Sequence, residues 1–168
     1  MSGQTRQTNF VLQQGMEAPT GDGCSVAYSG LLFQPRVIGA VVLVTSLLQS
    51  ATVFAMLAAV LLWSAAFPRL NPFDAIHNRL FASRSGFRLT PAPSPRRFAQ
   101  ALAGLFSLVI ATLLTFGQRA LAITVEVLLL IAIAALVFGG FCLGSYVFHL
   151  LTGRKAFANR TLPWSRAA

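Results

Sequence analysis

The stretch VIGAVVLVTSLLQSATVFAMLAAVLLWSAAF, residues 37–67, decides the fold of this chain, because its 31 residues include no charged one. A helix that crosses a membrane needs about 20 consecutive apolar residues. The run is therefore too long for one simple span and short for two. Polar side chains at Ser46, Gln49 and Ser50 lie in its middle. We interpret the run as a helical hairpin that turns near Gln49–Ser50, and a single long tilted helix is the alternative.

The composition of the whole chain also indicates a lipid environment. Of its 168 residues, 55% are hydrophobic and only 10% are charged, whereas soluble domains carry about 25% charged residues. Thirteen basic residues against four acidic ones give a net charge of +9. In a soluble protein such an excess would suggest nucleic acid. Here the basic residues flank apolar runs, so they indicate membrane topology, and we expect no nucleic-acid partner.

Two further apolar segments predict a second hairpin. Residues 98–116 predict one clean span, and Gly117–Gln118 predicts a turn. Residues 120–151 predict a last span that is longer than a bilayer needs, so we expect it either to be tilted or to emerge into water at its end. The expected fold class is an all-α integral membrane protein with four transmembrane helices arranged as two hairpins. Three spans remain the alternative.

The loop between the two hairpins, residues 68–97, is basic. Within it, residues 72–82 predict a short interfacial helix, with Asn71 as its N-cap and Pro72 in its first turn. His77 lies near Asp74 and is expected to be a solvated loop residue. Five arginines are candidates for contact with anionic lipid head groups: Arg79, Arg84, Arg88, Arg96 and Arg97.

The chain divides into three parts on this interpretation. Residues 1–35 form a polar tail that we expect to be largely disordered, residues 36–151 form the transmembrane domain, and residues 152–168 form a basic tail. Because basic residues collect on the cytoplasmic side, the loop and the C-terminal tail are expected in the cytoplasm. The N-terminal tail is nearly neutral. The side of the membrane on which the N-terminal tail lies depends on the number of spans. Four spans would place this tail in the cytoplasm as well.

The segment GFCLGSYVF, residues 140–148, contains glycines that suit helix packing. Gly140 and Gly144 have the G-x-x-x-G spacing, which places two small residues on one face of a helix, and Gly139 adds another. Such a face lets a second backbone approach closely. The partner is either another span of this chain or a different subunit.

The same region contains a thiol and an imidazole. Cys142 is a candidate redox residue, although most free cysteines are small buried hydrophobes. Cys24 lies in the polar tail, so the two cysteines are not expected to meet. His149 follows Cys142 by seven residues and is a candidate ligand for haem or chlorophyll, with an interfacial polar role as the alternative. The sequence identifies no cofactor and no metal site.

Glu126 is the only acidic residue inside an apolar segment. Ionisable groups in a membrane are expensive and are usually paired or functional. Arg119, seven residues earlier on the same helix face, is the expected partner, and contact of Glu126 with water is the alternative. No pair of carboxylates, no nucleophile with a base and no phosphate-binding loop is present in the sequence. We therefore expect the protein not to be an enzyme.

Three stretches together resemble a known family. They are PRLNPFDAIHNRL (68–80), PRRFAQALAG (95–104) and GFCLGSYVF (140–148). Their order resembles the bacterial membrane proteins grouped as domain of unknown function 4395. The resemblance covers roughly residues 33–151, and it implies four transmembrane helices in the inner membrane of a bacterium.

The resemblance also implies a link to thiol chemistry, because the family motif carries two cysteines. Cys142 matches the first of them, and Ser145 replaces the second, so dithiol exchange within the motif is impossible here. We therefore expect a small accessory or assembly subunit of a larger membrane complex, with membrane lipids and other membrane subunits as partners. A bioenergetic complex would suit such a subunit. A thiol-linked component that acts through Cys142 with a thioredoxin-like partner is the alternative.

Overall fold

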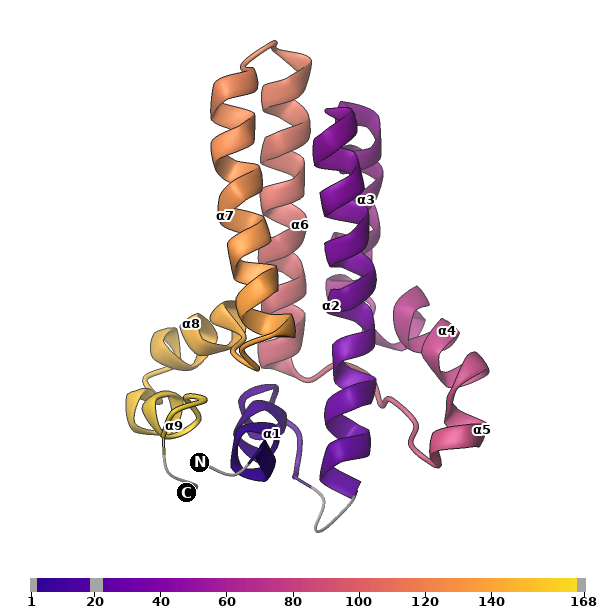
Figure 1. Ribbon diagram of the computed structural model, residues 1–168, viewed down its shortest axis with the longest axis vertical. Helices are drawn as coiled ribbons and strands as arrows, with labels where there is room; N and C mark the ends of the chain where they lie inside the picture. Colours follow the sequence, from indigo (N-terminus) through magenta and orange to yellow (C-terminus); the bar gives the residue numbers. More distant parts are fainter. Residues whose placement is uncertain (1–2, 19–22, 166–168) are drawn as a thin grey trace.

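The computed structural model describes residues 3–18 and 23–165, and these form helices and turns without any strand. The chain is therefore an all-α protein (Figure 1). In chain order, its helices are α1 (Gly3–Gln13), α2 (Gly23–Leu48), α3 (Ala51–Ala66), the short 3-10 helix η1 (Pro68–Leu70), α4 (Pro72–Leu80), α5 (Ala82–Ser85), α6 (Ser94–Thr115), α7 (Arg119–Val137), α8 (Leu143–Leu151) and α9 (Lys155–Arg160).

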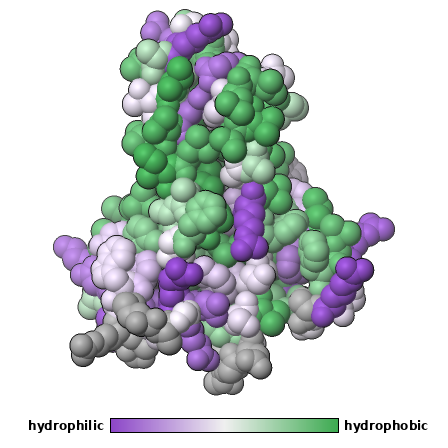
Figure 2. All heavy atoms as spheres, viewed as in Figure 1, coloured by the Kyte–Doolittle hydropathy of each residue, from purple (hydrophilic) through white to green (hydrophobic). Residues whose placement is uncertain are grey.

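Four helices form a shaft, and the others gather at one end of it. In Figure 1, α2, α3, α6 and α7 run along the long axis, while α1, α4, α5, α8 and α9 form a broad end. On the face drawn in Figure 2, hydrophobic residues dominate the shaft, hydrophilic ones appear at its far end, and the broad end is of mixed character. Helices α2, α6 and α7 are long and apolar enough to cross a membrane, and α3 is a shorter apolar helix. The protein is therefore a multi-pass membrane protein.

The first hairpin turns where the sequence predicts it. Helix α2 ends at Leu48, Gln49 adopts a left-handed φ of 48°, and the Ser50 side chain accepts a hydrogen bond from the backbone N–H of Val53. A single long helix over residues 37–67 is therefore excluded. The run is long enough for two helices because α2 begins at Gly23, well before the apolar stretch starts.

The expectation of a largely disordered N-terminal tail is wrong for the residues that the structure describes. Helix α1 is ordered against α2, and it buries Phe10 and Val11 almost completely. The rest of the supposed tail, from Gly23 onward, is the first half of α2. The two buried apolar residues of α1 lie in a cluster with residues of α2 and with Leu89 and Cys142.

The second hairpin differs from its prediction at its C-terminal end. Helix α6 is the predicted span, although it begins slightly earlier, at Ser94, and Gly117 turns the chain with a φ of 72°. The prediction of one long last span is wrong. Helix α7 ends at Val137, Gly140 adopts a left-handed φ of 64°, and the chain then leaves the shaft as the separate helix α8 (Figure 1).

The basic loop contains the predicted short helix. Helix α4 starts after Asn71, whose side chain accepts a hydrogen bond from the backbone N–H of Phe73, with Pro72 in the first turn. His77 is not a solvated loop residue, because it is buried and its ring packs against Phe33 and Phe81. Helix α4 is thereby fastened to the lower half of α2.

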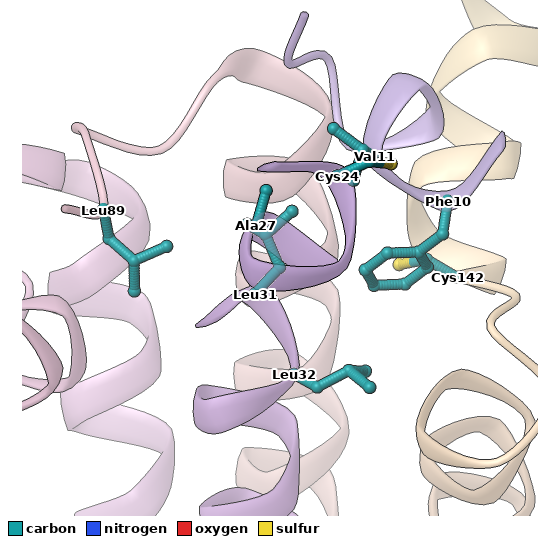
Figure 3. Close-up of a cluster of buried hydrophobic side chains, with 8 residues drawn as sticks. All are labelled: Phe10, Val11, Cys24, Ala27, Leu31, Leu32, Leu89 and Cys142. Carbon is teal, nitrogen blue, oxygen red and sulfur yellow. The ribbon is translucent and has the colours of Figure 1, made fainter. Parts of the chain in front are cut away.

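Two apolar clusters hold these parts together. One lies inside the shaft between α2, α3, α6 and α7. The other lies where the shaft meets the broad end, and Figure 3 shows its side chains coming from α1, α2, the loop before α6 and the start of α8. Burial of this second cluster places α1 and α8 next to the lower end of α6, where the polar residues described below are found.

Candidate functional site

A buried polar cluster lies at the junction of the shaft and the broad end. The Arg96 guanidinium in the first turn of α6 forms an ion pair with Asp74 of α4, with 2.6 Å between Nη2 and Oδ1. The same Nη2 donates to Gln34 Oε1 of α2 at 2.9 Å. Gln100, one turn further along α6, donates from Nε2 to the same oxygen at 2.8 Å. The cluster therefore joins three helices through one arginine and two amides.

This cluster changes the interpretation of the arginines as lipid ligands. Arg96 is only 5% exposed and is already paired, so its assignment to lipid head groups is wrong. The Arg97 Nε donates to the backbone carbonyl of Ala65 at the end of α3. Arg79, Arg84 and Arg88 are exposed and remain open to contact with solvent or head groups.

A cavity of about 500 Å³ lies beside the polar cluster. Helices α2, α6 and α7 form most of its wall, and the start of α8 and the end of α1 close its lower part. The lining is mainly aliphatic and aromatic, with Ile38, Phe106 and Leu129 among its members. Four polar side chains also line it: Gln14, Gln34, Arg96 and Gln100.

Three of these polar side chains carry a buried atom that has no hydrogen-bond partner among the described protein groups. Gln34 Nε2, Gln100 Oε1 and Gln14 Nε2 are all buried without a hydrogen-bond partner. The orientation of the Gln34 amide follows from its neighbours, because Arg96 and Gln100 both donate to its oxygen. The unsatisfied groups of these cavity-lining residues are therefore two amide nitrogens that can donate and one carbonyl oxygen that can accept.

Cys142 borders the same cavity but is engaged in structural contacts. It occupies the N-cap of α8 rather than the interior of a span, and its backbone N–H donates to Gln13 Oε1 at 2.9 Å. The residue is 6% exposed, and its thiol is free. Cys24 is buried in the same apolar cluster, and both cysteines are free. Figure 3 shows them at different levels of the cluster, with the Phe10 ring beside Cys142 in this view.

His149 is buried in the broad end. Its Nε2 lies 3.1 Å from the backbone carbonyl oxygen of Gln13, and its ring packs edge-on against Phe157. In the part of the chain that the structure describes, no three His, Cys, Asp or Glu residues are grouped as a metal site would require. Gln13 thus contacts both Cys142 and His149, and this fastens the end of α1 to α8.

The glycines of the 140–148 segment have separate roles. Gly144 lies where α8 crosses α6, because an added Cβ would lie 2.7 Å from the Cα and Cβ atoms of Ala99. Gly140 does not share a helix face with it, and neither does Gly139, because both lie in the turn that ends α7. The prediction of a continuous G-x-x-x-G face is therefore wrong.

Glu126 is paired with a different residue from the one expected. Its two carboxylate oxygens accept hydrogen bonds from Gln49 Nε2, at 3.2 and 3.0 Å. Arg119 is exposed at the first position of α7 and forms no ion pair with Glu126. The contact joins α7 to the turn between α2 and α3, so it holds the two hairpins together.

Sequence reasoning did not identify Gln34, Gln14 or Asp74 as members of a site. A signal for part of the cluster was present, because Arg96 and Gln100 are four residues apart and lie on one face of a helix. Gln100 also lies in the stretch PRRFAQALAG (95–104), which carries part of the family resemblance. The contribution of α1 and α4 depends on tertiary contacts, which the sequence pattern does not contain.

The comparisons with known proteins assign the chain to a family. The family model described as a domain of unknown function (DUF4395) matches residues 29–152, which includes α2 through α8 apart from the first turns of α2. No curated protein and no solved structure matches the sequence significantly. The matched range contains the polar cluster and most of the cavity wall, whereas α1 and α9 lie outside it. The chain therefore belongs to the DUF4395 family.

Proposed function

We propose that the protein is a non-enzymatic accessory or assembly subunit of a larger membrane complex. The observation that carries this proposal is that the buried charged and polar side chains named below bind other groups of the protein. Asp74 and Arg96 neutralise each other, Glu126 is held by Gln49, and His149 is held by the backbone of α1. These groups connect helices. Side chains poised for acid–base or nucleophilic chemistry would instead face a substrate site.

The charge distribution supports a cytoplasmic broad end in the inner membrane of a bacterium. Exposed basic residues of the loop and of the C-terminal segment lie at the same end of the molecule, and this end carries both described termini (Figure 1). Basic residues on one side favour the cytoplasmic leaflet and its anionic lipids. The exposed basic side chains that support this orientation are Arg79, Arg84, Arg88, Arg154, Lys155 and Arg160.

The test is extraction from native membranes in a mild detergent, followed by a native gel. We expect the chain to migrate with a complex much larger than its 18.0 kDa, with partner subunits identified by mass spectrometry of the band. A visible spectrum of the band would show whether the complex carries a pigment. Extraction in a harsh detergent is the control and should release the chain alone. A lone, stable small band in the mild detergent would contradict the proposal.

A thiol-linked role is the second candidate, and one observation favours it. Cys24 and Cys142 are both free thiols in one buried cluster, so a second thiol accompanies Cys142 even though Ser145 replaces the motif cysteine. The partner on this view is a thioredoxin-like protein. Substitution Cys142→Ala should abolish a trapped mixed disulfide if the thiol is functional, and Cys24→Ala tests whether the second thiol takes part. Unchanged partner association in both variants supports the accessory role instead.

A further inference from the structure

We propose that the cavity beside Arg96 binds a membrane lipid with a neutral head that carries carbonyl or hydroxyl groups and with a long apolar tail. Prenyl quinones and diacylglycerols share this chemistry. The proposal goes beyond the accessory role, because it concerns a small molecule held by this chain alone. It can be tested on the purified protein, so its failure is distinguishable from failure of the subunit proposal.

The shape of the cavity suits an elongated tail. Along α6 its lining extends from Arg96 to Phe106, and along α7 from Leu128 to Leu136. At a rise of 1.5 Å per residue, these stretches are about 15 and 12 Å long. The volume of about 500 Å³ falls within the range of small-molecule sites, which is roughly 300–1,000 Å³.

The cavity opens on the side of the shaft. Three of its lining residues are also well exposed on the molecular surface: Leu128, Ile131 and Leu143 are 53%, 60% and 45% exposed. All three are apolar and belong to α7 or the start of α8. A ligand would therefore enter from the hydrocarbon region rather than from water, which favours a lipid over a soluble metabolite.

Gln14, Gln34, Arg96 and Gln100 form the polar floor of the cavity. Their hydrogen-bonding groups determine which kind of head group the cavity can bind. Buried polar atoms in proteins are nearly always hydrogen-bonded, because an unsatisfied one loses its interaction with water. The floor offers unpaired donors at Gln34 Nε2 and Gln14 Nε2, and an unpaired acceptor at Gln100 Oε1. A carbonyl oxygen of a ligand would accept from such a donor, and a hydroxyl group would donate to the acceptor. These are the hydrogen bonds that the protein itself leaves unmade.

The charge of the floor favours a neutral head over an anionic one. Arg96 is the basic side chain in the cavity lining, and Asp74 already compensates its charge through a 2.6 Å ion pair. A carboxylate or phosphate would have to be desolvated without a free cation to balance it, which is unfavourable away from water. Anionic amphiphiles should therefore bind weakly, although the exposed arginines of the loop attract them elsewhere.

The first experiment titrates the purified full chain in detergent with three probes. They are a decyl-substituted benzoquinone, dioctanoylglycerol and oleate, and binding is followed by the shift in melting temperature and by native mass spectrometry. We expect saturable one-to-one binding of a neutral probe, with a rise in Tm, and no saturable binding of oleate. A preference for the quinone or for the glyceride identifies the kind of head group, and either result supports the site. Saturable binding of oleate alone, or of no probe, would overturn the proposal.

A matched pair of variants on α7 locates the binding. Ala132 lines the cavity, whereas Ala134 is exposed and does not. Ala132→Phe should fill the cavity and weaken binding at least tenfold, and Ala134→Phe should change it by less than twofold. Equal effects of the two substitutions would mean that the probe binds the detergent-facing surface, and the proposal would then be wrong.

A third variant separates a binding role from a structural one. Gln14 presents an unpaired buried donor at the cavity, so Gln14→Leu removes no protein hydrogen bond from that nitrogen. The variant without probe should melt at or above the temperature of the wild type, yet bind the neutral probe at least tenfold more weakly. Unchanged affinity in this variant would overturn the assignment of the head group to the polar floor.

Discussion

At the scale of single residues, the molecule depends on polar contacts that join helices in an apolar environment. The Arg96–Asp74 pair is the clearest of them, because both side chains are buried and the pair connects α6 to the short helix α4. Gln49 has a similar role at the other end of the shaft, where it donates both to the Ser46 carbonyl and to Glu126. A buried pair of this kind contributes most visibly when one partner is removed.

The substitution Asp74→Asn tests the buried pair. It preserves the shape of the side chain but leaves the Arg96 charge uncompensated, so we expect a loss of about 3–5 kcal/mol in the free energy of unfolding. Circular dichroism during chemical unfolding in detergent micelles measures the loss. The control is Glu17→Gln, which removes the same charge from an exposed position and should change stability by no more than about 0.5 kcal/mol. Similar losses in both variants would contradict the assigned role of the pair.

At the scale of elements, local signals in the sequence predicted helices better than they predicted helix ends. The first hairpin was predictable because a cap-forming serine and a glutamine interrupt an uncharged run. Helix α4 was predictable from Asn71 and Pro72, since capping chemistry is local. The break between α7 and α8 was missed because the apolar pattern continues across it. Only packing of α8 on α6 and α1 shows that the chain turns there.

The break between α7 and α8 is testable through Gly140. A residue with a side chain at a φ of 64° is strained, so Gly140→Ala should destabilise the protein by about 1–2 kcal/mol. If the two helices were continuous, the same change would instead stabilise it by up to about 1 kcal/mol. Thermal unfolding in detergent gives the sign. The helical control is Gly3→Ala, where an added Cβ meets no atom within 4 Å and no loss is expected.

At the scale of the whole molecule, the two ends of the shaft differ in character. One end carries the turns between α2 and α3 and between α6 and α7, and the other end carries the short helices (Figure 1). The exposed basic side chains of the loop and of the C-terminal segment share this broad end. If the broad end lies in the cytoplasm, both basic segments are on the cytoplasmic side, as the positive-inside rule requires.

Single cysteines test this orientation in a background that carries Cys24→Ala and Cys142→Ala. Arg88→Cys and Arg154→Cys place thiols at exposed positions of the broad end, and Gln118→Cys places one at the turn between α6 and α7. A membrane-impermeant maleimide should label the first two only from the cytoplasmic side and the third only from the opposite side. Labelling of all three from one side would show that the shaft does not cross the membrane as we propose.

The sequence by itself determined the membrane environment, the two hairpins, the capped helix in the loop and the family. These properties follow from hydropathy, capping and motif order, which act over short stretches of chain. Only the tertiary structure decided that the N-terminal segment is ordered, that Arg96 is paired with Asp74, and that Glu126 meets Gln49 rather than Arg119. It also decided where the cavity lies. Each of these features joins residues distant in sequence, and their pairing depends on which helix faces burial brings together.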